Sequence, residues 1–123
     1  MRSIALVISA FAGIAGIAGV ATSPAQAQAS DRSARCVVST EGYLTYRGPC
    51  RFYPEGAGSF TVTPLRGTFP GEVTGISVSI SERGVAEVYG LTPAGAASRW
   101  GTAVRSRRDR ACWNGPDFSV CAY

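Results

Sequence analysis

The residues with the clearest chemical potential are arginines near the C-terminus. The segment Arg105-Ser106-Arg107-Arg108-Asp109-Arg110 carries four guanidinium groups and one carboxylate, and Arg99 shortly precedes it. Guanidinium groups bind phosphate and carboxylate groups through a planar fork of hydrogen-bond donors. The segment therefore predicts a site for an anionic partner, made of Arg99, Arg105, Arg107, Arg108 and Arg110. An ordinary charged turn that keeps a basic protein soluble explains the same pattern.

Carboxylates offer the other possible chemistry. Two acids can cleave a glycosidic bond without any histidine. However, Glu41 and Glu82 fall in predicted turns, Asp117 falls in a loop, and Glu87 points outward from a predicted strand. Solvated positions of this kind do not activate an acid or a base. We therefore expect no enzyme, and the alternative is a small carboxylate-dependent hydrolase that acts on a cell-wall or sugar substrate.

The residue types that the chain lacks exclude several further mechanisms. All twelve basic residues are arginine, and histidine is absent. The commonest general base, the commonest metal ligand and the lysine that forms Schiff bases are therefore missing. Cys36, Cys50, Cys112 and Cys121 show no C-x-x-C spacing. We expect no metal site and no cofactor.

The N-terminal segment predicts export. Arg2 is followed by an apolar run over residues 4–21 and by two overlapping Ala-x-Ala sites at residues 25–29. A positive start, an apolar centre and small residues at the end are the three parts of a secretory signal. We assign residues 1–29 to a cleavable signal-peptide helix, residues 30–35 to a flexible leader and residues 36–123 to one small domain. A retained membrane anchor is the alternative.

The domain itself has the pattern of a β protein. Short runs rich in Val, Ile, Thr, Tyr and Phe alternate with Gly, Pro and charged residues, as in short strands joined by turns. We predict a single antiparallel meander of about seven to eight strands that forms a sandwich or a partly open barrel. The predicted strands are residues 35–39, 43–47, 59–63, 76–81, 85–91, 99–105, 110–113 and 118–122.

Two hairpins allow a prediction of register. A loop at residues 82–84 pairs Ile80 with Ala86 and Val78 with Val88, which places all four apolar side chains on one face. By the same logic, a loop at residues 40–42 pairs Val38 with Leu44, and therefore Cys36 with Tyr46. In the sixth strand, Trp100, Thr102 and Val104 are expected to point inward, which sends Arg99 and Arg105 outward.

The four cysteines predict two disulfides in an exported chain. Three connectivities are possible. Loop-closure entropy favours Cys36–Cys50 and Cys112–Cys121. A four-residue loop at residues 114–117 would place Cys112 opposite Ser119 and make Cys121 only its diagonal neighbour, at about 7–8 Å between β-carbons. That distance would require a bulge or bend near Cys121, and Gly48-Pro49 supplies such a bend before Cys50.

Several motifs together carry a resemblance. They are residues 46–50 (YRGPC), 58–60 (GSF), 111–113 (ACW) and 118–122 (FSVCA). With these motifs the chain resembles small exported proteobacterial proteins that contain two disulfides. The resemblance implies no activity and no site residues.

These observations predict an exported domain, periplasmic or extracellular, that acts by binding or inhibition of a partner. The expected partner is a protein or an anionic component of the envelope, not nucleic acid. The arginine-rich loop is the expected contact. Removing residues 1–29 leaves eleven arginines against eight acids, which argues against an inhibitor of a basic lysozyme. We expect a monomer with no transmembrane span after cleavage. A structural envelope protein is a further alternative.

Overall fold

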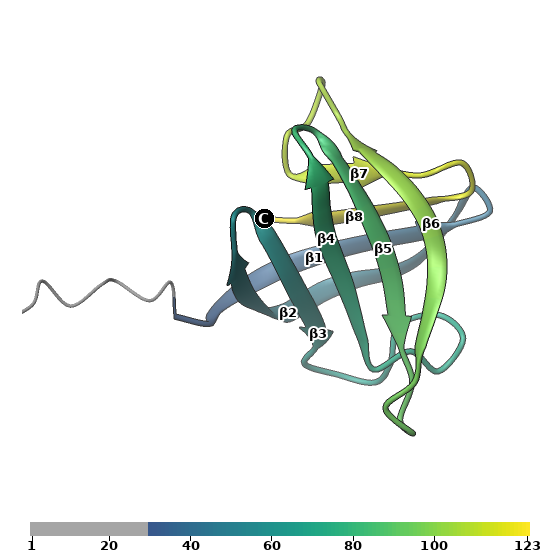
Figure 1. The fold of residues 1–123 in the computed structure, drawn as a ribbon. Coiled ribbons are helices and arrows are strands. Elements are labelled where there is room, and N and C mark those ends of the chain that lie inside the picture. The colour runs from purple at the N-terminus through teal and green to yellow at the C-terminus, as the bar shows by residue number, and fades with distance from the viewer. Residues whose placement is uncertain (1–29) are drawn as a thin grey trace, which may run out of the picture.

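Residues 30–123 form a closed antiparallel β-barrel in the computed structural model, which describes this part of the chain (Figure 1). Each strand pairs with the next, and the last pairs with the first. The all-β meander is confirmed, and the barrel is closed rather than partly open. The strands are β1 (Arg32–Thr40), β2 (Tyr43–Gly56), β3 (Ser59–Pro64), β4 (Gly75–Glu82), β5 (Val85–Leu91), β6 (Ala97–Arg105), β7 (Cys112–Asn114) and β8 (Phe118–Ala122).

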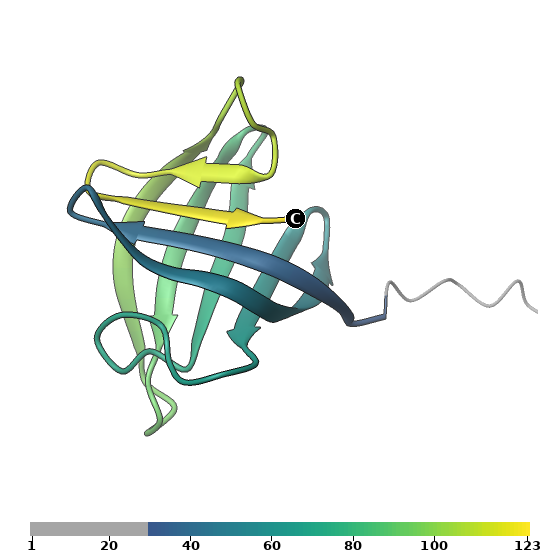
Figure 2. The ribbon, with the colours of Figure 1, turned by 180° about the vertical axis from the view of Figure 1, so that it is seen from behind.

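The up-and-down order gives the barrel two chemically different ends. The β2–β3, β4–β5 and β6–β7 connections lie at one end, together with the start of β1 and the end of β8. The remaining connections lie at the other end. In Figures 1 and 2 the β4–β5 and β6–β7 connections are at the top and the β5–β6 turn is at the bottom. We call the first end the arginine end, because Arg83 and residues 105–110 belong to its connections.

Alternate side chains of the strands fill the barrel interior. The fully buried side chains include Val38, Val62, Ile76, Val78, Val88 and Val120. The register predicted for β4 and β5 is confirmed, because Val78 pairs with Val88 and Ile80 with Ala86. An eight-stranded barrel is just wide enough for its own side chains to fill it, so this interior is a packed core.

The register predicted for the first hairpin is wrong. Val38 pairs with Tyr46, while Leu44 pairs with Ser39 and is 55% exposed. The turn consists of Glu41 and Gly42, both with positive φ (51° and 80°), as in the two-residue turns whose twist suits a hairpin. A bulge next to Val38 then shifts the register by one residue, which the alternation of apolar residues does not reveal.

A second bulge corrects the prediction for β6. Val88 pairs with Gly101 and Tyr89 with Arg99, which leaves Trp100 as the extra residue. Beyond this bulge the alternation is inverted, so Ala103 is buried while Thr102 and Val104 are exposed. Arg105 is in phase with Ala103 and therefore lies at the barrel mouth instead of on the outer wall.

The strand boundaries differ most from the predictions in β1, β2 and β7, and by one or two residues in β3, β4 and β6. Residues 32–35, expected in the flexible leader, are the first residues of β1, and Arg32 pairs with Phe52. Strand β2 continues through Gly48 and Pro49 to Gly56. Strand β7 covers only Cys112–Asn114. The predicted signal peptide, residues 1–29, lies outside the described residues. No helix among residues 30–123 has the length and apolar character needed to span a bilayer.

Both disulfides have the predicted local connectivity. Cys36 is bonded to Cys50 and Cys112 to Cys121, with Cα atoms 5.7 Å and 4.0 Å apart. Cys121 is the direct partner of Cys112 in the β7–β8 register, so the prediction that Cys112 faces Ser119 is wrong. The connection is residues 115–117, one residue shorter than predicted. It is Cys50 that lies diagonal to Cys36, whose register partner is Gly48.

Candidate functional site: the arginine end

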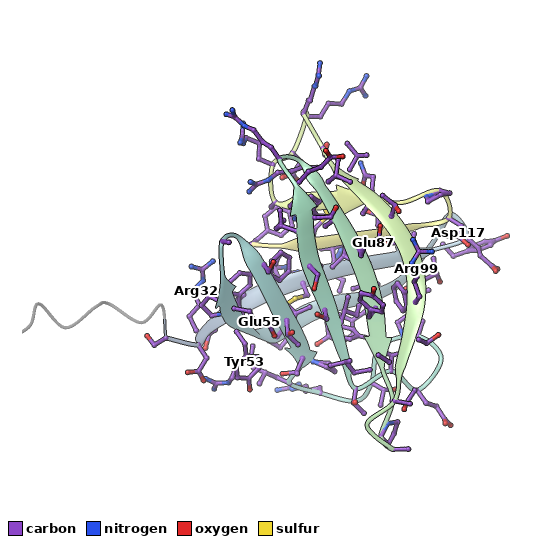
Figure 3. The ribbon with its side chains drawn as sticks, viewed as in Figure 1. Arg32, Tyr53, Glu55, Glu87, Arg99 and Asp117 are labelled. Carbon is purple, nitrogen blue, oxygen red and sulfur yellow. A yellow bond between two sulfur atoms is a disulfide. The ribbon has the colours of Figure 1, made fainter. Side chains whose placement is uncertain are left out.

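The structure divides the five arginines predicted for the site. Arg105, Arg107, Arg108 and Arg110 lie at the end of β6 and in the connection that follows, and all four are exposed. Arg99 lies nearer the other end of β6, on the outer wall (Figure 3). The predicted group is therefore four arginines at one barrel end and a separate fifth.

Arg99 belongs to an ion pair on the wall of the barrel. Its Nε donates a hydrogen bond to a carboxylate oxygen of Glu87 at 2.9 Å, and Thr102 Oγ1 donates to the other oxygen at 2.7 Å. The hydrogen bond from Thr102, followed by that from Arg99, lowers the pKa of the Glu87 carboxyl below its usual value. Arg99 is thus neutralised, and Glu87 points outward as predicted.

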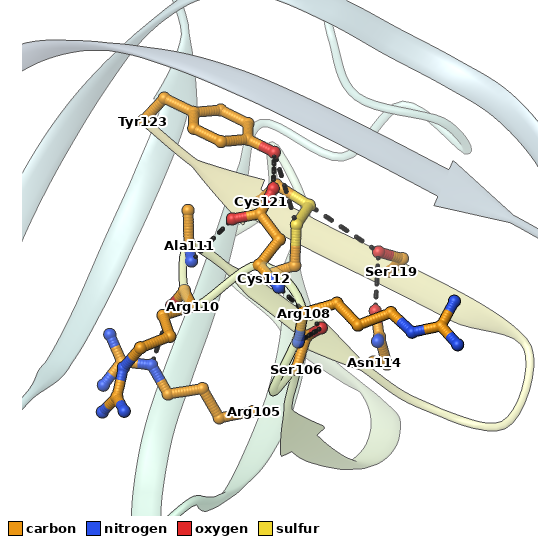
Figure 4. The surroundings of a disulfide bond; sticks show 11 residues. Arg105, Ser106, Arg108, Arg110, Ala111, Cys112, Asn114, Ser119, Cys121 and Tyr123 are labelled. Atoms are coloured by element: carbon orange, nitrogen blue, oxygen red, sulfur yellow. Dashed lines mark hydrogen bonds between the residues drawn. A yellow bond between two sulfur atoms is a disulfide. The ribbon is translucent and has the colours of Figure 1, made fainter.

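Backbone and serine hydrogen bonds shape the β6–β7 connection, residues 106–111 (Figure 4). The Ser106 N–H donates to the Cys112 carbonyl and the Cys112 N–H donates to the Asp109 carbonyl, each at 2.9 Å. Ser106 Oγ accepts from the N–H groups of Arg108 and Asp109 at 3.2 Å. Since Cys112 is bonded to Cys121, the loop is anchored covalently at the base.

Asp109, the only acid of this loop, is used in the loop's own structure. One carboxylate oxygen accepts the Ala111 N–H at 3.0 Å, and the other accepts the hydroxyl of Tyr123. The hydrogen bond to Asp109 raises the pKa of Tyr123 above its ordinary value. The carboxylate therefore ties the C-terminal residue to the loop that carries the arginines.

Two arginines that the sequence analysis missed complete this end. Arg32 at the start of β1 lies over the ring of its register partner Phe52, with Cζ 4.4 Å from the ring centroid. Arg83 lies in the β4–β5 turn. Both are far from residues 105–110 in the sequence. Pairing of β5 with β6 brings the Arg83 turn to Arg105, whose N–H donates to the Gly84 carbonyl at 2.9 Å, and closure of the barrel brings the start of β1 to the same end. The predicted meander order was the signal that could have placed Arg32 and Arg83 at this end. To use it, one had to choose a barrel over a sandwich.

The barrel mouth at this end contains a hollow of about 330 Å³. We call it the mouth hollow. Its charged lining residues are Arg32, Arg83, Arg105 and Arg110, and the rest of its lining is apolar, aromatic or glycine. Arg105 is held there by a 2.8 Å hydrogen bond from its Nε to the Arg110 carbonyl and by the Trp113 ring, 5.6 Å from its Cζ. A second hollow on the outer side shares Arg83, Arg105 and Arg110 and adds Arg107.

The opposite end brings two carboxylates to one hollow. Glu41 and Asp117 line a hollow of about 290 Å³ with Arg99 and Trp100. The Glu41 N–H donates to the Asp117 carbonyl at 2.6 Å, which joins the two turns. Both side chains are exposed, and no element of the fold buries either carboxyl. This hollow is the place where a carboxylate mechanism would have to act.

Within residues 30–123, no group of three or more His, Cys, Asp or Glu side chains could hold a metal ion. Comparisons of the chain with protein-family models, with curated proteins and with solved structures find no match. No family is therefore shown for this chain.

Proposed function

We propose that this chain is an exported, non-catalytic binding protein that holds an anionic partner at its arginine end. The observation that carries the proposal is the charge at this end. Two ion pairs occur in the described residues, Arg51–Asp31 and Arg99–Glu87, and neither involves the arginines gathered there. Guanidinium groups without carboxylate partners create a positive potential that attracts anions. These arginines are Arg32, Arg83, Arg105, Arg107, Arg108 and Arg110.

Export is supported by the two disulfides, since disulfides persist in oxidising compartments. Expression of the full chain in a bacterium with a periplasm tests this part. We expect a mature chain that begins at Ser30 and is recovered, fully oxidised, from the periplasm or the medium. Recovery of the uncleaved chain from the cytoplasm would contradict the export proposal.

The partner that best suits this end is an anionic component of the envelope. Vesicles of phosphatidylglycerol and of phosphatidylcholine, mixed with the oxidised chain at low salt, test this proposal. We expect binding to the anionic vesicles only. We also expect this binding to weaken in physiological salt, because charges are screened there over about 8 Å.

Substitutions locate the binding. Arg107→Gln with Arg108→Gln removes two exposed charges of the loop, and we expect at least a fivefold weaker binding to anionic vesicles. Arg66→Gln, an exposed arginine beyond β3 at the opposite end, is the matched control and should bind like the parent. If the parent chain binds neither anionic vesicles nor a soluble polyanion at low salt, the arginine end is only a solubilising surface. Binding to an acidic protein alone would replace the envelope component as the partner.

The hydrolase is the second candidate, and the observation that favours it is the hollow shared by Glu41 and Asp117. A glycosidase needs one carboxyl to act as an acid and a second to act as a base or nucleophile. Incubation with peptidoglycan and with chitin oligosaccharides tests it. We expect no cleavage products, and products that disappear in Glu41→Gln or Asp117→Asn would establish the enzyme instead.

A further inference from the structure

We propose that the mouth hollow binds one small organic anion with an aromatic or short apolar body. The acidic group would contact the arginines and the body would lie against the aromatic floor. This inference rests on the proposed binding function and narrows it, because it names the chemical class of ligand that the same end takes.

The polar side chains around the hollow require an acceptor. The polar side chains of the lining are four arginines and the indole of Trp113. The arginines are Arg32, Arg83, Arg105 and Arg110, and the other lining residues carry no polar side-chain atom. Arginine and tryptophan side chains donate hydrogen bonds and accept none. A cation would find no side-chain acceptor here and would be repelled, whereas a carboxylate, sulfonate or phosphate supplies acceptors for these donors together with the opposite charge.

Two of the four guanidinium groups are already positioned. Arg105 is held by the Arg110 carbonyl, and that bond uses only Nε, which leaves the terminal nitrogens to contact a ligand. Arg32 lies against the Phe52 ring. Side chains held before binding lose less conformational entropy when a ligand arrives.

The floor of the hollow is aromatic. Phe52 and Phe60 stack with ring centroids 4.7 Å apart, and Trp113 is a third aromatic residue of the lining. Phe60 and Trp113 are only 5% and 4% exposed. Aromatic surfaces of this kind favour planar or compact apolar groups, so the ligand should have an apolar body as well as a charge.

The packed core limits the length of that body. Below the mouth, the interior is filled by side chains such as Val62, Val78, Val88 and Val120, each fully buried. The hollow of about 330 Å³ is at the lower end of the range for small-molecule sites, roughly 300–1,000 Å³. A ligand with a long acyl chain would not fit, whereas a compact body of two or three aromatic rings would.

Fluorescence titration with 8-anilinonaphthalene-1-sulfonate tests the inference on the oxidised chain. N-phenyl-1-naphthylamine has the same rings without the acid, and inorganic sulfate has the acid without the rings. We expect one bound sulfonate dye per chain, with a Kd at least tenfold lower than that of either comparison compound. Near-ultraviolet circular dichroism checks that the dye reports on the folded barrel.

Paired variants separate this hollow from the loop. Arg32→Gln with Arg83→Gln should weaken dye binding at least tenfold, and Ala122→Leu, which fills part of the hollow, should weaken it at least fivefold. Arg107→Gln with Arg108→Gln changes residues outside the lining and should leave the dye Kd unchanged, although it weakens vesicle binding. Retained near-ultraviolet spectra show that these variants fold.

Each outcome decides a different claim. Equal binding of the neutral amine would show an apolar hollow without anion selectivity, and equal binding of sulfate would show a cationic patch without a use for the aromatic floor; either result overturns the inference. No dye binding by a chain that binds anionic vesicles overturns the inference and leaves the proposed function standing. A chain that binds neither the dye nor the vesicles overturns both.

Discussion

Gly90 has no side chain, and its absence leaves room for the indole ring of Trp100. A Cβ atom there would lie 2.6 Å from Nε1 of Trp100 and 3.1 Å from Cγ2 of Val73. Trp100 in turn packs edge-to-face on Phe118, with centroids 5.7 Å apart. Since the indole is held from both sides, it cannot move away without a cost.

Gly90→Ala should therefore destabilise the barrel by about 1–3 kcal/mol, the usual cost of overpacking a core. Urea unfolding followed by tryptophan fluorescence measures this loss. Gly75→Ala is the matched control in β4, because its nearest contact would be 3.3 Å, to Leu91 Cδ1, and we expect a much smaller change. Equal stability of the two variants would show that Trp100 moves freely.

Glu87 provides a pH-dependent contribution to stability. Its pKa is lowered from the ordinary value of 4.5 by Thr102 and Arg99. A lowered carboxyl pKa stabilises the folded state above the unfolded pKa, and this contribution is lost as the pH falls through the folded pKa.

We predict that Glu87→Gln melts at a lower temperature than the parent at pH 7 and that this difference closes as the pH falls below 4.5. Thermal unfolding at several pH values checks the trend. Glu82→Gln makes the same charge change at the exposed end of β4 and serves as the control. A pH-independent difference for Glu87→Gln would mean that the carboxylate charge is irrelevant.

Each disulfide joins neighbouring strands, but the two have different roles. Cys36–Cys50 is fully buried and joins β1 to β2, whereas Cys112–Cys121 joins β7 to β8 and anchors the arginine loop. They span sequence separations of 14 and 9 residues, so loop entropy predicts a similar contribution of about 3 kcal/mol from each.

Cys112→Ala with Cys121→Ala and Cys36→Ala with Cys50→Ala should therefore both lose about 3 kcal/mol of unfolding free energy. Only the first pair should also weaken vesicle binding, because residues 106–111 lose their covalent base. Urea unfolding and the vesicle assay measure the two effects. If vesicle binding weakened when Cys36–Cys50 was removed but not when Cys112–Cys121 was removed, anchoring of the loop would not matter.

At the scale of whole strands, the bulges of β2 and β6 determine which side chains face the barrel interior. One extra residue turns every following side chain to the other face. In β2 it leaves Leu44 exposed, and in β6 it brings Arg105 to the mouth. The hydrophobic pattern predicted the strands but not these positions, because each short run fits two registers almost equally well.

At the scale of the whole molecule, closure of the sheet into a barrel limits how two copies of the chain could associate. Every strand of the described barrel pairs with a neighbour on both sides, which leaves little open edge to which a second copy could add a strand. The main exception is β6, which pairs with β7 only at Val104 and Arg105. We predict that the oxidised chain from Ser30 onward sediments as a monomer at micromolar concentrations. A stable dimer would point to strand addition along the part of β6 that β7 leaves unpaired, or to a side-chain interface, for which exposed Tyr43 and Leu44 would be the first residues to substitute.

The sequence by itself determined the all-β class, the approximate places of the strands and the inner face of the β4–β5 hairpin, and it favoured the two local disulfides. These features depend on alternation and on short loops, which are local in the chain. The tertiary structure decided that the sheet closes, that Arg99 pairs with Glu87, and that Arg32 and Arg83 join Arg105 and Arg110 around the mouth hollow. Pairing of β1 with β8 depends on contacts between segments that are distant in the sequence, for which a local pattern carries no signal. The bulges lie between consecutive strands, but the alternation of apolar residues does not show where an extra residue enters.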